Sequence, residues 1–260
     1  ELTYQGILAD QKICRDPCDC YNETTQPFLN IEADVRNNNN LQESLDQMCQ
    51  GDELSGENAY HCAKHDMKVT ALKRTCIKQL PNTMVVQLKR FEHDWENDRP
   101  VKINDRFEFP LAIDMEPWTV AGLARRDAEI NGQASAAEVE AKTAALETGS
   151  DETTKGTVFR LAGVVVHSGT ATAGHYYSFI RNRNANGIPD GFMWHKFDDK
   201  QVTPWAQTDA DMESEFFGGE YTPKFGNIYA KQERSWSAYI LFYERVNQTA
   251  EGTGQTVVEV

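Results

Sequence analysis

Gly163-Val-Val-Val-His-Ser-Gly-Thr-Ala-Thr-Ala-Gly-His-Tyr-Tyr-Ser-Phe-Ile180 is the stretch around which the rest of the chain is organised. It begins with a β-branched apolar run, which is typical of a buried strand. The run breaks at Ser168-Gly169, and a loop of small residues ends at Gly174. His175 then opens a second strand-like run. A histidine between a glycine and a rigid strand is held still and stays reachable, which suits a general base.

A carboxylate partner for His175 is expected from the next predicted strand. Trp194-His-Lys-Phe197 has strand character and precedes Asp198-Asp199, while the intervening loop Asn184–Gly191 is rich in turn residues. A hairpin across that loop places Asp198 opposite Tyr176, to within a residue or two, and cross-strand neighbours lie about 5 Å apart. Asp198 would then orient the imidazole, as in a Cys-His-Asp arrangement. The alternative is a purely structural strand histidine.

The spacing of the cysteines favours a metal site over disulfides. Cys18-x-Cys20 and Cys62-x2-His65 are two local pairs in separate parts of the chain, each beside a predicted strand. Three thiolates and one imidazole in this pattern predict a structural zinc site. Cys14 is a rival first ligand through Cys14-x3-Cys18, and the alternative for the whole group is buried free thiols. Cys49 and Cys76 are interpreted as packing residues.

The charge and hydropathy of the chain exclude two classes of partner. A net charge of −14 over 260 residues argues against binding to a nucleic-acid backbone and favours a basic or neutral protein partner. No apolar run approaches the ~20 residues of a membrane helix. The start, Glu1-Leu-Thr-Tyr4, has no signal-peptide pattern and no initiator Met. We therefore expect a cytoplasmic location without membrane contact, and we interpret the chain as a fragment.

The sequence pattern divides the chain into segments. Residues 14–80 form a first unit, residues 82–120 and 157–246 are β-rich, and residues 247–260 form a loose polar tail. Residues 121–156 lack aromatic side chains and are predicted to be a flexible insertion with one short helix at Ala136–Leu146.

Three shorter elements can also be predicted from their pattern. Asn37–Asn40 are expected to cap a helix whose apolar face includes Leu41 and Leu45. Lys102–Phe109 alternates apolar and polar residues, which predicts a half-buried strand. Asp209–Phe217 is expected to form a short helix ended by two glycines.

Four motifs occur along the chain: Gln87-Leu-Lys-Arg-Phe91, His167-Ser-Gly…Gly-His-Tyr-Tyr-Ser178, Trp194-x-Lys-Phe-Asp-Asp-x-x-Val202 and Ala238–Tyr243. The last three resemble the histidine box of the ubiquitin-specific proteases, and the first resembles another strand of that family. The resemblance runs from about Cys14 to Val246. Ile103–Pro110 and Met115–Val120 resemble the large fat-facets-type members of that family.

The resemblance implies an α+β fold of the papain-like cysteine protease superfamily, predominantly antiparallel β with few helices. It implies fingers at residues 14–80 with a zinc ion at their tip, and a palm formed by residues 82–120 and 157–246. It also implies that His175 is the base and Asp198 its orienting partner, with Asp199 assisting. The second zinc pair of the family is usually Cys-x2-Cys, and this chain departs from it at His65.

The family's nucleophile box, Gly-Asn-Thr-Cys, is absent from this sequence. Family order places it upstream of Glu1, so the thumb subdomain is expected to be missing from the chain. The expected function is the C-terminal part of a thiol deubiquitinase that hydrolyses the isopeptide bond after the last glycine of ubiquitin. Its expected partners are ubiquitin, ubiquitinated proteins and the missing thumb segment. The alternatives are an inactive ubiquitin-binding module and a plain zinc-stabilised structural domain.

Overall fold

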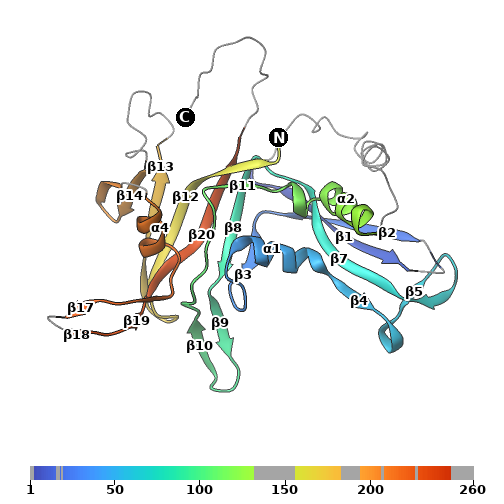
Figure 1. Ribbon diagram of the computed structural model, residues 1–260, viewed down its shortest axis with the longest axis horizontal. Coiled ribbons are helices and arrows are strands. Elements are labelled where there is room, and N and C mark those ends of the chain that lie inside the picture. The colour runs from blue at the N-terminus through green and yellow to red at the C-terminus, as the bar shows by residue number, and fades with distance from the viewer. Residues whose placement is uncertain are drawn as a thin grey trace, which may run out of the picture.

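The computed structural model describes residues 3–15, 18, 20–131, 156–182, 194–205, 208–225 and 228–246. Among these residues, eight strands form a central sheet (Figure 1). Its order is β15 (Gln201–Trp205), β14 (Trp194–Asp198), β13 (Gly174–Arg181), β12 (Val158–Gly169), β20 (Trp236–Arg245), β8 (Thr83–Lys89) and β3 (Ile31–Asp34), with β11 (Ala112–Asp114) also paired to β12. Every pair is antiparallel except β3–β8, which is parallel.

A second sheet extends to one side of the first, on the right in Figure 1. In the described part of the chain it contains four strands in the order β2 (Tyr21–Phe28), β1 (Gly6–Cys14), β7 (Ala71–Gln79) and β4 (Asp52–Leu54). The described residues also form four short two-stranded ribbons: β5 (Tyr60–Cys62) with β6 (Met67–Val69), β9 (Phe91–Asp94) with β10 (Arg99–Lys102), β16 (Glu220–Tyr221) with β19 (Gln232–Glu233), and β17 (Lys224–Phe225) with β18 (Ile228–Tyr229).

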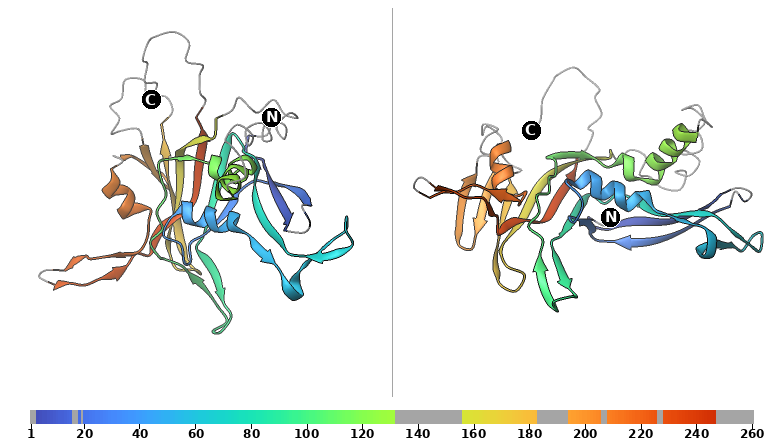
Figure 2. Two further views of the ribbon diagram at one scale, coloured as in Figure 1. Left: turned by 45° about the vertical axis from the view of Figure 1, so that its right-hand side comes forward. Right: turned by 60° about the horizontal axis from the view of Figure 1, so that its bottom comes forward.

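The predicted helix after Asn40 is confirmed as α1 (Leu41–Gln50), which packs on β7 (Figure 2). The Asn40 side chain accepts a hydrogen bond from the Glu43 backbone N–H at 2.9 Å, which satisfies one of the free donors of the first turn. Leu41, Leu45 and Cys49 recur every four residues and are all buried, as an amphipathic helix requires.

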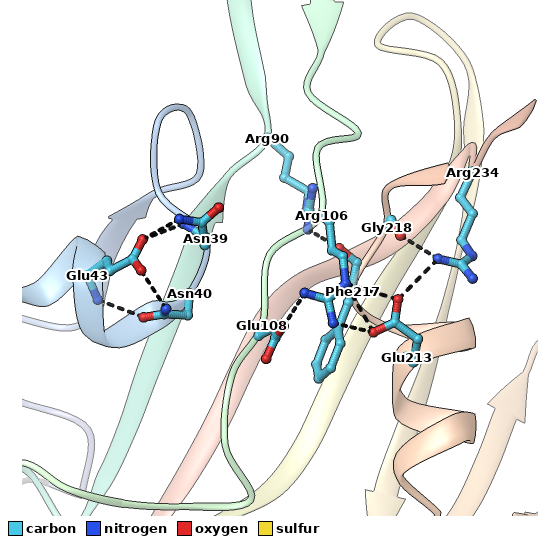
Figure 3. A network of polar contacts seen from close by, with 10 residues as sticks. All are labelled: Asn39, Asn40, Glu43, Arg90, Arg106, Glu108, Glu213, Phe217, Gly218 and Arg234. Atoms are coloured by element: carbon cyan, nitrogen blue, oxygen red, sulfur yellow. Dashed lines mark hydrogen bonds and ion pairs between the residues drawn. The ribbon is translucent and has the colours of Figure 1, made fainter. Parts of the chain in front are cut away.

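The second predicted helix is confirmed as α4 (Asp209–Glu215). A reciprocal capping box between Thr208 and Asp211 starts it. Gly218 and Gly219 follow it with φ of 76° and 75°, a left-handed conformation that glycine adopts without steric cost. Figure 3 shows Arg106 and Arg234 reaching Glu213 on this helix, Arg106 with an Nη2–Oε2 distance of 2.6 Å.

Arg90 directly follows β8 and is 1% exposed. Its guanidinium donates to the carbonyls of Ala238, Ile103, Asp105 and Phe217 at 2.8–3.3 Å. Burial lowers its pKa to about 10, since desolvation disfavours the charged form. The side chain therefore joins the central sheet to the segment after β10 and to the chain beyond α4.

The prediction of a strand over Lys102–Phe109 is wrong for most of its length, because regular pairing stops at Lys102. The apolar residues Ile103, Phe107 and Phe109 are all buried, as the alternating pattern predicted. The backbone N–H of Ile103 bonds the Arg90 carbonyl, and that of Phe107 bonds the Phe217 carbonyl. The segment is extended and packed in the core, but it has no single partner strand, and a strand is defined by its ladder.

The segment predicted to be an insertion begins as helix α2 (Val120–Asn131). Leu123 is buried, and Asp127 pairs at 2.8 Å with Arg74 of β7. Arg125 also pairs with Glu116, and Arg126 pairs with Asp46 of α1. A buried leucine and several ion pairs thus dock a helix whose composition is otherwise polar. The predicted helix at Ala136–Leu146 and the predicted loose tail from residue 247 lie outside the described residues.

The sheets also cross the predicted unit boundaries. β1 starts at Gly6, before the predicted unit 14–80, and pairs with β7 inside it. β3 lies within residues 14–80 but pairs with β8 in the central sheet. Strand pairing depends on which distant segments meet, and a linear division of the sequence contains no such information. Helix α1 contributes to the same continuous apolar core as the central sheet.

Candidate active site and metal centre

His175, at the start of β13, and Asp198, at the end of β14, are joined across two neighbouring strand ends of the central sheet. The Nε2 atom of His175 lies 2.7 Å from Oδ1 of Asp198, and the two side chains are 47% and 37% exposed. The ionised carboxylate accepts, so Nε2 donates and carries the proton. Among the described residues no hydrogen-bond partner reaches Nδ1, which leaves that nitrogen available to take a proton from a reacting group.

Strand pairing produces this contact. The hairpin predicted between β13 and β14 is confirmed, with Ser178 opposite Phe197. Continued to the next pair, this register sets Asp198 opposite Tyr177, one residue from the expected position. Side chains two residues apart share a face of a strand, so His175 and Asp198 lie as diagonal neighbours on one face, within side-chain reach.

The turn before His175 is built from close backbone contacts. Gly169 pairs with Gly174, and Ser168 pairs with His175. A Cβ on Gly169 would lie 2.5 Å from the Ala173 carbonyl, and its φ is +124°. A Cβ on Gly174 would lie 2.2 Å from Nε2 of His167. Both positions therefore require glycine, and these close contacts explain why the loop consists of small residues.

Asp199 occupies the turn between β14 and β15 with φ +50°. Its carboxylate lies with the ligand atoms of His175 and Asp198 within a mutual distance of 4.8 Å. The pKa of His175 is raised above its usual value, first by the hydrogen bond to Asp198 and further by the charge of Asp199. Both carboxylates thus stabilise the imidazolium.

Two residues beside His175 were not predicted from the sequence. The Tyr177 ring stacks on the imidazole with centroids 6.3 Å apart, and the Lys196 ammonium lies 4.1 Å from the centre of the Tyr177 ring. Lys196 Nζ also lies 3.8 Å from Oδ2 of Asp198. The two-residue period of a strand could have predicted both neighbours. Tyr177 shares a strand face with His175, and Lys196 shares one with Asp198.

The four predicted metal ligands are brought together at the far end of the second sheet. Nδ1 of His65 lies 3.0 Å from Sγ of Cys18, 3.6 Å from that of Cys20 and 3.8 Å from that of Cys62. The Sγ atoms of Cys18 and Cys62 are 3.5 Å apart. Ligands of a tetrahedral zinc ion at about 2.0–2.3 Å lie roughly 3.5–3.8 Å from one another. Three of the four distances fall in this range, and the contact between Cys18 and His65 is shorter.

Cys62 is the ligand best prepared as a thiolate. The backbone N–H groups of His65 and Lys64 donate to its sulfur and lower its pKa to about 6. By contrast, the hydrogen bond with Cys18 raises the pKa of Cys20 to about 12. A bound cation would stabilise the thiolate forms of these cysteines, including that of Cys20, which ionises only with difficulty without one.

Cys14, the rival ligand, packs beside this group and is 6% exposed. Burial, followed by the neighbouring thiols Cys18 and Cys62, raises its pKa to about 11. Its ligand atom is not among the four within 4.8 Å of one another, so Cys14 belongs to the apolar surroundings of the cluster. Cys49 and Cys76 are buried in the main core, as predicted.

All six cysteines are described, and all are free. Cys18, Cys20 and Cys62 lie at the candidate metal centre with Cys14 packed beside them, Cys49 lies on α1 and Cys76 lies on β7. None contacts the His175 ring, so the chain brings no thiol to the histidine. No helix in the described parts of the chain has the length and apolar character of a membrane span.

Relatives of this sequence are found among very large proteins. Ubiquitin carboxyl-terminal hydrolase 9Y of Homo sapiens is 44% identical over 253 residues, which is 95% of this chain and 10% of that protein. The probable ubiquitin carboxyl-terminal hydrolase FAF of Drosophila melanogaster is 43% identical over 260 residues, 95% of this chain and 9% of that protein. The chain thus spans about a tenth of the length of these relatives.

The fold also resembles a solved structure. The structure of the SAGA Ubp8/Sgf11/Sus1/Sgf73 DUB module bound to ubiquitin aldehyde matches with a TM-score of 0.62 and 24% sequence identity, over 94% of this chain and 42% of that chain. At that identity the similarity establishes the fold alone, which in this chain is a mainly antiparallel α+β architecture. The family "Ubiquitin carboxyl-terminal hydrolase" matches residues 4–243, and the chain belongs to the ubiquitin carboxyl-terminal hydrolase family.

Proposed function

We propose that this chain is the fingers and palm part of a ubiquitin-specific thiol protease that hydrolyses the isopeptide bond after the C-terminal glycine of ubiquitin. The observation that carries the proposal is the 2.7 Å bond from His175 to Asp198, which leaves Nδ1 free to accept a proton. A base and its orienting carboxylate are two of the three parts of a Cys-His-Asp arrangement.

The third part, the thiol, is assigned to a segment outside this chain, because no cysteine here contacts His175. Family order places a Gly-Asn-Thr-Cys box upstream of Glu1, in the thumb. His175 would take the thiol proton, and the thiolate would attack the carbonyl carbon of the ubiquitin glycine. The lysine amine would leave with that proton, and a water deprotonated by His175 would then hydrolyse the thioester.

We assign supporting roles to Asp198 and Asp199. Asp198 holds the imidazole with Nε2 protonated and stabilises the imidazolium that forms during proton transfer. Asp199, at the adjacent turn, adds negative charge beside the ring and is a candidate to polarise the attacking water. The small residues between Gly169 and Gly174 would let the narrow ubiquitin tail pass close to His175.

For the metal, we propose one structural Zn²⁺ held by Cys18, Cys20, Cys62 and His65. The four ligand atoms lie within 4.8 Å of one another, three of the four quoted distances match a tetrahedral ion, and an imidazole is a good substitute for the usual fourth thiolate. The ion would join the β1–β2 connection to the β5–β6 ribbon. In this assignment the four-stranded sheet with its two ligand pairs is the fingers, and the central sheet is the palm.

We propose ubiquitin and ubiquitinated proteins as partners, and a cytoplasmic location. Six free cysteines suit a reducing compartment. The acidic chain suits a neutral or basic protein partner rather than a nucleic acid. The second candidate function is a ubiquitin-binding module without catalysis, which the lack of a thiol at His175 favours for this segment in isolation.

The experiment is a covalent ubiquitin probe with an electrophilic C-terminus, applied to this chain and to a longer form of the protein extended upstream. Labelling and turnover are expected only in the longer form, and His175→Ala should abolish turnover there while ubiquitin binding persists. Turnover by the isolated chain would overturn the assignment of the thiol. Failure of the longer form to turn over would favour the binding module.

A further inference from the structure

Lys102, the last residue of β10, connects three parts of the chain around the turn that precedes His175. Its Nζ donates to the carbonyls of His167 at 3.0 Å, Gly169 at 3.3 Å and Ser235 at 2.6 Å. An ammonium has three N–H donors, so all three have a carbonyl partner. Within the described ranges, no carboxylate lies within ion-pair distance of this Nζ.

The three carbonyls belong to the support of the β12–β13 turn. His167 and Gly169 end β12, and Ser235 precedes β20. The Gly169 backbone N–H also bonds the Ser235 carbonyl at 2.8 Å. Because Ser168 pairs with His175, the ammonium contacts the strand end directly opposite the proposed base.

A ring contact from the same ribbon adds to the polar one. Phe91 of β9 pairs with Lys102 in the β9–β10 ribbon. Its ring meets the His167 ring edge-on at 5.1 Å and the Tyr239 ring at 5.2 Å. His167 is 4% exposed and lies against Tyr176, with ring centroids 4.8 Å apart. Lys102 and Phe91, at the base of the β9–β10 ribbon, therefore hold the backbone of the turn and its buried His167.

The position of Lys102 is electrostatically costly, which suggests a specific role. Desolvation, followed by the nearby charge of Arg90, lowers its pKa to about 8. A side chain of the same length with a neutral end would fill this space without the desolvation cost. The ammonium instead provides three donors that converge on three carbonyls.

We propose that Lys102 is a positioning residue for the hydrolysis, acting through the β12–β13 turn on His175. The inference rests on the proposed function and deepens it, because it adds a residue that touches neither substrate nor thiol. With the ammonium removed, three carbonyls lose a donor and the turn loses its polar link to β10, while its backbone pairing with β20 remains. A displacement of about 1 Å at a catalytic group can lower a rate roughly a hundredfold.

The test compares Lys102→Met and Lys102→Arg in the longer form of the protein that contains the thiol. Lys73→Met is the matched control, because Lys73 is an exposed lysine of β7 in the other sheet. Steady-state kinetics on a ubiquitin C-terminal amide substrate give kcat and KM. Hydrogen exchange at the Gly169 amide and the NMR titration of His175 report on the turn without reference to activity.

We expect Lys102→Met to lower kcat about tenfold to a hundredfold with KM changed less than about threefold. The Gly169 amide should exchange faster, and the pKa of His175 should fall because its bond to Asp198 loosens. Lys102→Arg keeps the charge and several donors, so it should recover part of kcat, and Lys73→Met should match the wild type.

Three results for Lys102→Met would overturn the role of Lys102. The first is a kcat within twofold of the wild type, and the second is a change in KM alone. The third is a fall in kcat that matches a fall in the folded fraction while the pKa of His175 is unchanged. The proposed function would fail in a different way, through turnover that persists in His175→Ala. The two failures are therefore distinguishable in the same assay.

Discussion

Nε2 of His175 lies 2.7 Å from Oδ1 of Asp198, across the pairing of β13 with β14. The carboxylate therefore holds the proton on Nε2 and directs Nδ1 away from Asp198. The same contact raises the pKa of His175 above its usual value. The register of β13 with β14 therefore affects the protonation of the His175 ring, and the pKa of that ring can be measured.

Asp198→Ala is expected to lower the pKa of His175, because the hydrogen bond to Asp198 is the main cause of its elevation. Asp199→Ala should lower it less, since Asp199 acts only through its charge. An NMR titration of the imidazole Cε1 proton measures both changes. An unchanged pKa in Asp198→Ala would contradict the contact.

The sign of the accompanying stability change follows from linkage. The folded-state pKa of His175 lies above the unfolded value near 6.5, so its stabilising contribution is complete below about pH 6.5 and is lost as pH rises through the folded pKa. Urea denaturation of the wild type and Asp198→Ala across this window should show their difference shrinking as pH rises. A difference that grows with pH would refute the assignment.

In the longer, thiol-containing form, Asp198→Asn should lower kcat by about a thousandfold or more, because the wrong tautomer of the imidazole becomes accessible. Asp199→Asn should cost less, since it leaves the hydrogen bond in place. Asp209→Asn, on the exposed start of α4, is the matched control for removal of one negative charge. Equal losses in all three variants would indicate a general charge effect instead.

Purified protein is expected to contain about one equivalent of zinc, and His65→Ala should contain almost none. His65→Cys should retain it, since sites of four thiolates and of three thiolates with one imidazole are both stable. Zinc should be released as pH falls, because the ligands bind only when deprotonated. Mass spectrometry of metal content gives the stoichiometry. Equal zinc content in His65→Ala and the wild type would exclude His65 as a ligand.

Removing the metal should loosen the second sheet selectively. The proposed ion joins Cys18 and Cys20 to the β5–β6 ribbon, while the core around β12 and β20 has no contact with it. After chelation, amides of residues 60–69 should exchange faster and those of β12 should be unchanged. Uniform acceleration across both sheets would mean that the metal supports the whole fold.

Arg90→Met is expected to lower the free energy of unfolding by about 3 kcal/mol or more, because it leaves buried carbonyls without a charged donor. Arg36→Met is the control, since Arg36 forms an exposed pair with Glu92, and such pairs contribute about 0–1 kcal/mol. Urea denaturation gives both values. Similar losses in the two variants would show that the Arg90 bonds add little.

Gly174→Ala should destabilise the protein by about 1–3 kcal/mol, because the added Cβ overlaps the His167 ring and the Ser168 carbonyl. Gly163→Ala, in the same strand pair, meets its nearest atom at 3.6 Å and should be tolerated within about 0.5 kcal/mol. The melting temperatures of the two variants give the comparison. Full stability of Gly174→Ala would show that the turn can open.

The elements that could be predicted from sequence are those set by short-range rules. The β12–β13 hairpin follows from a β-branched run interrupted by glycines, and α1 follows from an asparagine cap with apolar residues every four positions. The contact between His175 and Asp198 could be predicted for the same reason, because one turn-rich loop separates their strands. Each pair of candidate metal ligands could be predicted because its two members are close in sequence. The sequence did not predict how close Cys18 and His65 lie in space.

Other features depended on contacts between segments that no local pattern relates. In the sequence, Lys102 is only the first residue of an alternating run, and its three carbonyl partners become evident only where the end of β10 meets the end of β12 and Ser235. Arg90 is similar, and α2 is docked by Leu123 and by the pair between Asp127 and Arg74. A side chain's period along the chain indicates which face it occupies. The atoms that it meets there are decided by which backbones the tertiary structure brings within a few ångströms, because hydrogen bonds to main-chain carbonyls have no sequence signature of their own.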